Sequence, residues 1–144
     1  MTVTWIPATS VTESLLWDLA DLAARELCDP PRTDVALRRE HLLPLFRRRF
    51  MDHENGLAVV MEAKKVVAFS SVVVEKLLGH PSNEALPRVC YLTVEPQWRK
   101  QGLGSQLLRY CEAWARAKGH QQLAVYVFPE QTALQEWRLR NEMK

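Results

Sequence analysis

The spacing of hydrophobic and polar positions changes repeatedly along this chain, and each change marks an expected helix or strand. Apolar residues at three- and four-residue steps predict four helical segments, at about residues 10–27, 34–51, 104–118 and from 132 onward. Valine-rich or continuously apolar runs predict five strands, at residues 3–6, 57–62, 66–78, 89–94 and 123–128. Strands and helices mixed in this order predict an α/β fold.

Local signals refine the ends of several elements. Ser10 and Glu13 have the spacing of a capping box at the start of the first helix. Pro44 lies inside the second helical segment, so we expect that segment to bend or divide there. Only three residues separate the strands at 57–62 and 66–78, which predicts an antiparallel pair joined by a tight turn.

Composition indicates one compact cytoplasmic domain. The chain has 144 residues, 47% of them hydrophobic, which is enough for one core, so we assign residues 1–144 to a single domain. No apolar run approaches twenty residues, and no charged-then-apolar leader opens the chain. We therefore expect a cytoplasmic protein without a membrane span. The net charge of +2 is too small to indicate a polyanionic partner.

The positions of cysteine and histidine predict reduced thiols and no metal site. Cys28, Cys90 and Cys111 cannot all pair with one another, and the last two lie within apolar patterns. The histidines are scattered, and no Cys/His spacing resembles a zinc site.

Arginines are concentrated in the second helical segment, where they occupy Arg38, Arg39, Arg47, Arg48 and Arg49. Such a cluster could bind nucleic acid, an acidic peptide or the phosphates of a cofactor. No interleaved set of aromatic residues for stacking on bases accompanies the cluster, since its two phenylalanines fit the apolar face of the helix. We therefore favour a solvated helical face over nucleic-acid binding.

The stretch with the clearest chemistry joins the fourth expected strand to the third helix. Gly102 and Gly104 lie at the helix entry, where residues 101–105 would present unpaired backbone N–H groups at the positive end of the helix dipole. The two glycines would let an anion approach the backbone closely, and Arg99 and Lys100 add positive charge beside it. A phosphate or pyrophosphate is the natural ligand, although glycines at a helix entry also serve plain turns.

The spacing of this loop differs from the best-known phosphate loops, because it lacks the third glycine of the dinucleotide fingerprint and any Gly-Lys-Ser/Thr. It resembles instead the acyl-CoA-binding motif of the GNAT superfamily of N-acetyltransferases. That motif is Arg/Gln-x-x-Gly-x-Gly/Ala after a strand ending in apolar-x-Val-x-Pro. The strand here ends in Leu92-Thr93-Val94-Glu95-Pro96, and the loop reads Arg99-Lys100-Gln101-Gly102-Leu103-Gly104. The order of the expected elements also matches the family over nearly the whole chain.

The resemblance implies a mixed, mostly antiparallel central sheet with helices on both faces, and acetyl-CoA as co-substrate without a metal. The pantetheine arm would pair with the backbone of Leu92, Thr93 and Val94, in a gap between the fourth and fifth strands. A backbone N–H near Val94 could polarise the thioester carbonyl. The residues implied to hold the pyrophosphate are Arg99, Lys100, Gln101, Gly102, Leu103, Gly104 and Ser105. The implied reaction is acetyl transfer to a primary amine within a ternary complex.

The general acid and base of the family do not carry over to this sequence. Many members have a Tyr that protonates the departing thiolate, but alignment on Ala133 places Trp137 there and Glu130 at a common Asn position. An indole N–H is not a useful acid. Histone-type members carry a glutamate base early in the fourth strand, where this chain has Arg88.

Three other residues are candidates for acid and base chemistry, namely Glu75, Glu95 and Tyr126. Each also has a structural interpretation. Glu75 fits the exposed end of a strand, Glu95 fits a bulge or loop, and Tyr126 fits a packed aromatic.

GNAT domains usually continue past the last helix into a closing β-hairpin, for which this chain lacks residues. Asn141-Glu142 stands where the family commonly has Gly-Phe. Either the chain is shortened, or a partner completes the acceptor pocket through the uncovered edge of strand 123–128, so a homodimer is a hypothesis. Three functions stay open: an acetyl-CoA-dependent N-acetyltransferase, which we favour, a non-catalytic acyl-CoA sensor or inactive subunit, and a nucleic-acid or acidic-protein binder. The amine acceptor and the preferred acyl chain are left open.

Overall fold

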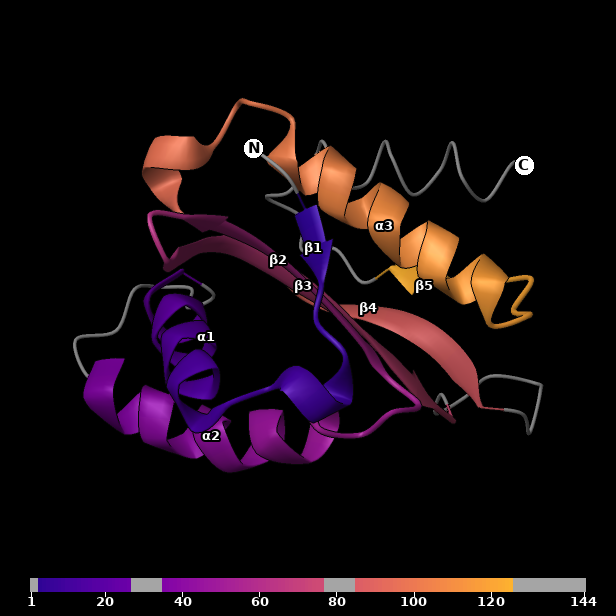
Figure 1. Ribbon diagram of the computed structural model, residues 1–144, viewed down its shortest axis with the longest axis horizontal. Coiled ribbons are helices and arrows are strands. Elements are labelled where there is room, and N and C mark those ends of the chain that lie inside the picture. Colours follow the sequence, from indigo (N-terminus) through magenta and orange to yellow (C-terminus); the bar gives the residue numbers. More distant parts are fainter. Residues whose placement is uncertain (1–2, 27–34, 77–84, 126–144) are drawn as a thin grey trace.

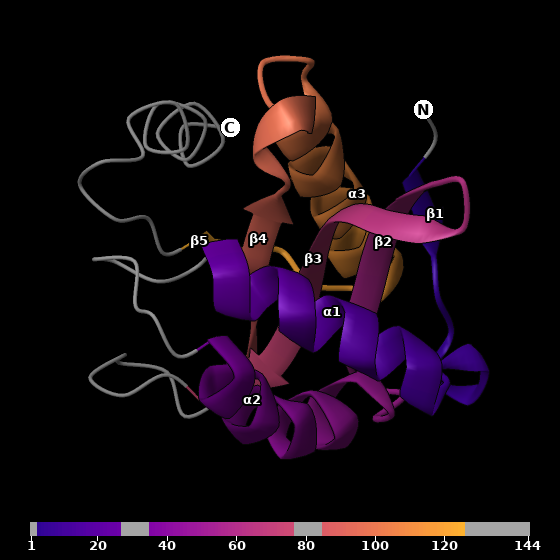
Figure 2. The ribbon, with the colours of Figure 1, turned by 90° about the vertical axis from the view of Figure 1, so that its left-hand side faces the viewer.

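The computed structural model describes residues 3–26, 35–76 and 85–125, which form one sheet between two layers of helices (Figures 1 and 2). The strands are β1 (Val3–Trp5), β2 (Gly56–Glu62), β3 (Lys65–Glu75), β4 (Leu86–Val94) and β5 (Ala124–Val125), and they lie side by side in sequence order. The first four pair antiparallel, while β5 pairs parallel to β4. The helices are α1 (Glu13–Glu26), α2 (Val35–Phe50) and α3 (Leu103–Ala117), with short 3₁₀ turns at Ala8–Ser10 and Pro96–Trp98. This confirms the expected mixed, mostly antiparallel sheet.

The turn between β2 and β3 follows directly from the chain geometry. Ala63 and Lys64 both have positive φ angles, of 51° and 67°, and Glu62 pairs with Lys65 across the turn. Two left-handed residues give a turn whose twist matches the twist of an antiparallel hairpin. The hairpin predicted from the valine-rich runs is therefore present.

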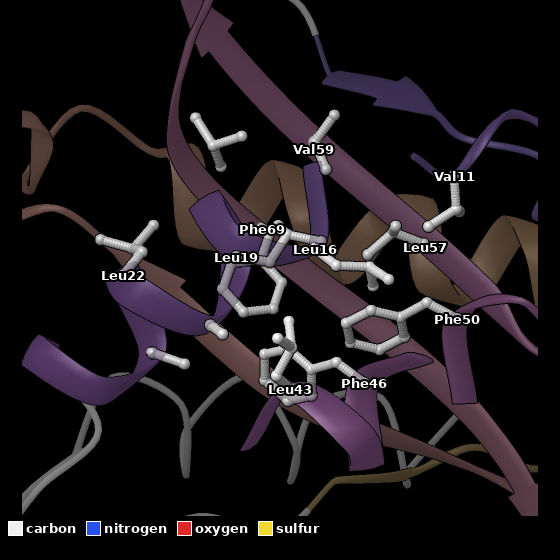
Figure 3. Close-up of a cluster of buried hydrophobic side chains, with 13 residues drawn as sticks. Val11, Leu16, Leu19, Leu22, Leu43, Phe46, Phe50, Leu57, Val59 and Phe69 are labelled. Atoms are coloured by element: carbon white, nitrogen blue, oxygen red, sulfur yellow. The ribbon is translucent and has the colours of Figure 1, made fainter. Parts of the chain in front are cut away.

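Helices α1 and α2 cover one face of the sheet and enclose the larger core. Figure 3 shows Phe46 and Phe50 of α2 meeting Phe69 of β3 and the leucines of α1, including Leu16 and Leu19. The ring centroids of Phe46 and Phe50 lie 4.7 Å apart, and Phe46 is fully buried. These are the apolar positions that the helical spacing predicted.

The structure corrects the expected cap of α1 and narrows the expectation for α2. The N-cap of α1 is Thr12 rather than Ser10, because the Oγ1 atom of Thr12 accepts a hydrogen bond from the backbone N–H of Leu15 at 3.1 Å. Of the two outcomes expected at Pro44, a bend or a division, the division does not occur, because α2 is one helix from Val35 to Phe50. Pro44 lies on the exposed side, where water can satisfy the carbonyl oxygen that a proline leaves unpaired.

Helix α3 covers the other face of the sheet (Figure 2). Leu107, Leu108, Cys111 and Ala115 form its buried side, as their spacing predicted. The helix ends before Gly119, whose φ angle of 87° is left-handed, as is common after the last turn of a helix. Within the described ranges, no helix has both the length and the apolar character needed to cross a membrane.

Candidate functional site

The entry of α3 presents backbone N–H groups to an open space. Gly102 precedes the helix with a φ angle of 80°, and the N–H of Gln106 donates to the Gly102 carbonyl at 3.0 Å. The amides of residues 103–105 come before that bond, so they point out of the positive end of the helix. A Cβ atom built on Gly104 would meet no atom within 4 Å. The helix entry therefore has backbone donors beside a position with open space, and these two features favour an anion.

Most of the predicted loop residues lie at the surface around this helix entry. Lys100, Gln101, Gly102 and Ser105 are exposed, while Leu103 is buried in the core under α3. Lys100 has a φ angle of 64°, so the backbone turns there before the glycine. The leucine anchors the loop, and its exposed neighbours are available to an anion.

Arg99 has partners within the protein. Its Nε atom donates to the carbonyl oxygen of Val94 at 3.0 Å, and its Nη2 atom donates to Glu26 Oε1 at 3.1 Å. The carboxylate of Glu26 ends α1 and is largely buried, with 16% of its side chain exposed. Arg99 thus ties the loop to β4 and to the end of α1.

The strand segment expected to hold the pantetheine is firmly anchored on one side. Thr93 and Val94 pair with Phe69 and Ala68 of β3, and the side chains of Leu92 and Val94 pack on the core under α3. In the described residues of β5, the pairing with β4 covers Arg88 and Val89. Residues 92–94 follow these paired residues along β4. Their edge on the β5 side is where the gap between β4 and β5 was expected.

A β-bulge interrupts β4 at Tyr91 and Leu92, where this segment begins. Thr93 pairs with Phe69 and Cys90 pairs with Ser71, so both Tyr91 and Leu92 stand opposite the single residue Ser70. Tyr91 has a φ angle of 60°, an uncommon conformation for a bulky residue. Burial raises the pKa of both Cys90 and Tyr91, and the positive charges of Arg49 and Arg88 oppose that rise.

Tyr91 lies between the aromatic core and a charged edge of the molecule. Its ring packs edge-on against Phe46 with centroids 4.8 Å apart. Its hydroxyl accepts a hydrogen bond of 2.7 Å from Arg49 Nη1. Burial raises the pKa of the Tyr91 phenol, and the positive charge of Arg49 opposes that rise. The phenol is therefore protonated at neutral pH. The sequence analysis did not identify Tyr91 as a candidate. Its only signal is that hydrophobic and polar residues do not alternate clearly along residues 89–92.

Glu75 and Glu95, two of the three acid/base candidates, lie at opposite ends of β4. Glu75 forms an ion pair with Arg88 and stands opposite Leu86, whereas Glu95 follows Val94 at the far end of the strand. The structure therefore does not bring the two carboxylates together. The third candidate, Tyr126, lies outside the described residues, as do Cys28, Glu130, Trp137 and the predicted last helix.

Glu95 lies in the short connection that follows β4, as expected, and it is buried. It is only 7% exposed, and its Oε1 atom lies 3.3 Å from Lys65 Nζ at the start of β3. Its backbone N–H donates to the Val67 carbonyl at 2.8 Å. Its Oε2 atom is buried without a hydrogen-bond partner among the described residues. Glu95 thus fixes the point where β4 enters the loop.

Three arginines of the α2 cluster are held by partners in the protein. Arg47 forms a bidentate pair with Glu13, Arg39 donates to Asp21 at 3.1 Å, and Arg49 contacts Tyr91. These contacts support the interpretation of the cluster as a structural and solvated helix face. Among the residues that the structure describes, no group of three His, Cys, Asp or Glu side chains could hold a metal ion.

The comparisons with known proteins agree with this geometry. A sequence model of the acetyltransferase (GNAT) family matches residues 17–137. Similar solved structures include a GCN5-related N-acetyltransferase from Ralstonia eutropha JMP134, with 17% identity, a TM-score of 0.70, and coverage of 94% of this chain and 88% of that one. An aminoglycoside N-acetyltransferase, AAC(6')-Iy, in complex with CoA has 15% identity and a TM-score of 0.68, covering 96% and 84% of the two chains.

A predicted acetyltransferase from Clostridium acetobutylicum, solved with acetyl-CoA, has 12% identity and a TM-score of 0.65, covering 89% of this chain and 81% of that one. At these identities the solved structures establish the fold alone. The search of curated proteins finds no match.

Proposed function

We propose that this chain, which belongs to the GNAT family of acetyltransferases, transfers an acetyl group from acetyl-CoA to a primary amine of a small molecule or protein. The observation that carries the proposal is the entry of α3. There the amides of residues 103–105, which precede the first hydrogen bond of the helix, and the open space beside Gly104 support a pyrophosphate site. Membership in the family makes acetyl transfer the expected reaction, and the helix entry is the position in this chain where we propose that acetyl-CoA binds.

Each part of the proposed donor site has a distinct task. The amides at the start of α3 would hold the pyrophosphate, and the exposed Lys100 would add charge beside it. The backbone of residues 92–94 would offer its outer edge to the amides of the pantetheine arm. The exposed Gln101 and Ser105 side chains would border the loop. Arg99 would keep loop and strand in register through Val94.

Bound acetyl-CoA supplies an activated acyl thioester, and the protein holds the amine and the thioester in position to react. A neutral amine held within reach of the thioester carbonyl converts a two-body encounter into a step within one complex. A backbone N–H near Val94 would stabilise the charge that develops on the carbonyl oxygen. Direct transfer in a ternary complex therefore requires no covalent intermediate on the protein.

The test is release of free thiol from acetyl-, propionyl- and succinyl-CoA in the presence of a panel of amines and peptides. Turnover of acetyl-CoA with at least one primary amine, accompanied by the acetylated product in the mass spectrum, supports the proposal. Tight CoA binding without turnover of any acyl donor would instead identify an acyl-CoA sensor or inactive subunit. The panel also identifies the acceptor and the acyl preference.

Three finer parts of the proposal have tests of their own. We propose a homodimer, which a light-scattering mass of one chain over a broad concentration range would contradict. We propose a cytoplasmic location, which fractionation of cells expressing the full-length protein would check. Binding to DNA or RNA that weakens steeply with salt would favour the nucleic-acid alternative, because phosphate contacts release counterions.

A further inference from the structure

The β4 bulge carries an inference that rests on the proposed function and adds a catalytic residue to it. An aromatic residue in the left-handed region is strained, and such strain persists only where the surrounding structure imposes it. Packing against Phe46 alone would not require the strain, because a regular strand residue also presents its ring to a helix. The strained position places a phenol two residues after Val89, which forms the last pair with β5 among the described residues, and next to the segment at residues 92–94.

We propose that the Tyr91 hydroxyl donates the proton to the leaving thiolate of the acyl donor, and that Arg49 positions this hydroxyl. Arg49 donates its own hydrogen to the phenol oxygen at 2.7 Å, so the phenol hydrogen is directed toward another acceptor. The guanidinium also stabilises the phenolate that remains after the proton has left. The centroid of the Tyr91 ring lies 5.8 Å from Arg49 Cζ, which keeps the cation close to the ring as well.

The other described candidates are placed less well for this task. Glu75 is held in an ion pair with Arg88 at the far end of β4, and Glu95 is buried against Lys65. Tyr91 is the half-buried group that combines an available proton with a cation to hold the resulting charge.

The proposed acetyl transfer needs no further proton donor or acceptor. The amine nitrogen forms a bond to the thioester carbonyl carbon, and the bond from that carbon to sulfur breaks. Tyr91 gives its phenol proton to sulfur, which yields the free thiol. The nitrogen carries one proton more than the amide needs, and this proton returns to the Tyr91 oxygen through water. Amine and thioester are thereby converted to amide and thiol, with the phenol restored.

The first test compares Tyr91→Phe with the wild-type chain in the thiol-release assay. Phe keeps the ring in its aromatic cluster and removes only the hydroxyl. We expect kcat to fall by about 100-fold or more, the range typical of a lost general acid, with the Kd for CoA within about twofold. Tyr110→Phe is the matched control, since Tyr110 is half-buried on α3 and packs against Trp5. An unchanged kcat in Tyr91→Phe overturns the inference.

The second test needs no turnover. The chain has three tyrosines, so protein labelled with ¹³C at Tyr Cζ gives three signals, and Tyr91→Phe assigns one of them. We expect saturating CoA to shift the Tyr91 signal and desulfo-CoA, which lacks only the sulfur, to leave it near its position in the free protein. The same Tyr91 signal with both ligands shows that the hydroxyl does not meet the sulfur, and overturns the inference.

The role of Arg49 is tested by Arg49→Gln against Arg48→Gln, its exposed neighbour on the same helix. We expect kcat to fall about tenfold in Arg49→Gln alone, with the KM for acetyl-CoA unchanged. Equal kcat in both variants contradicts the positioning role. Failure of the wild-type chain to turn over any acyl donor overturns the proposed function as well as this inference, whereas normal turnover by Tyr91→Phe overturns this inference alone.

Discussion

Arg99 and Val94 are joined by a hydrogen bond of 3.0 Å from the Nε atom of the arginine to the backbone carbonyl oxygen of the valine. The same guanidinium reaches Glu26 at the end of α1 through its Nη2 atom. One side chain therefore connects β4, the loop before α3, and α1 on the other face of the sheet. These contacts of Arg99 predict the effect of substituting it on CoA binding.

We expect Arg99→Ala to weaken CoA binding about tenfold or more. The change removes a charged hydrogen bond worth ~1.5–3 kcal/mol and releases the loop from the strand. Glu26→Gln is the matched control, because it removes only the carboxylate and leaves the guanidinium charge beside the loop. Isothermal titration with CoA should show affinity in Glu26→Gln that equals or exceeds that of the wild type. Wild-type affinity in Arg99→Ala would show that the arginine does not organise the site.

Gly104→Asp should abolish CoA binding while leaving the fold intact. The new carboxylate would occupy the open space beside Gly104 and place negative charge where we propose that the pyrophosphate binds. We expect the Kd to rise at least about 100-fold, or ~2.7 kcal/mol. Gly104→Ala controls for the backbone, because alanine suits a helix and its methyl group meets no atom within 4 Å. Both variants should retain the wild-type Tm within a few degrees, and unaltered CoA affinity in Gly104→Asp would refute the site.

Much of the fold could be predicted because it follows local rules. The three- and four-residue spacing of Leu107, Leu108 and Cys111 predicts the face that α3 buries, and the short link after Glu62 predicts the hairpin. The glycines at the entry of α3 also act locally, since Gly102 adopts the left-handed conformation and Gly104 leaves open space. Each of these features depends on residues close together in sequence.

The parts that sequence reasoning missed depend on residues far apart in the chain. The bulge at Tyr91 arises from the register between β3 and β4, which no residue of β4 specifies alone. Arg49 and Tyr91 are separated by 42 positions, and Arg99 and Glu26 by 73. Such contacts exist only after the helices have packed on the sheet. The general acid could not be assigned from the sequence for the same reason.

Gly56→Ala should destabilise the protein without affecting the CoA site. A Cβ atom at Gly56 would lie 2.9 Å from two atoms of the Trp114 ring, closer than real Cβ contacts allow. We expect the free energy of unfolding to fall by ~1–3 kcal/mol, as is typical when a packed core must accommodate an extra methyl group. Urea denaturation measures the change, and CoA affinity should be unaltered.

The double variant Gly56→Ala/Trp114→Leu checks the cause of that loss. Leucine removes the ring that the new methyl group meets, so the two substitutions should be less harmful together than their separate effects predict. Strict additivity would show that the clash with Trp114 is not the source of the destabilisation.

Alkaline pH should destabilise the protein through its buried thiol. Burial raises the pKa of Cys111 to about 12, and its Sγ atom lies 3.5 Å from Ser70 Oγ in the core under α3. An exposed thiol of the unfolded chain has a pKa of about 8.5. Between these values the folded chain retains a proton that the unfolded chain loses. The contribution of Cys111 to stability is therefore complete below about pH 8.5 and is lost as the pH rises toward 12.

Urea unfolding under reducing conditions at pH 7, 9 and 10.5 measures this dependence in the wild type and in Cys111→Ala. The free energy of unfolding should fall by up to ~1.4 kcal/mol for each pH unit above the ordinary thiol pKa because of this one group. Burial also raises the pKa of Cys90 and of Tyr91, so part of the alkaline loss should remain in the variant. Cys111→Ala lowers stability at pH 7 through lost packing, but its stability should decline less steeply with pH. Parallel curves for the two proteins would show that Cys111 ionises as readily in the folded chain as in the unfolded one.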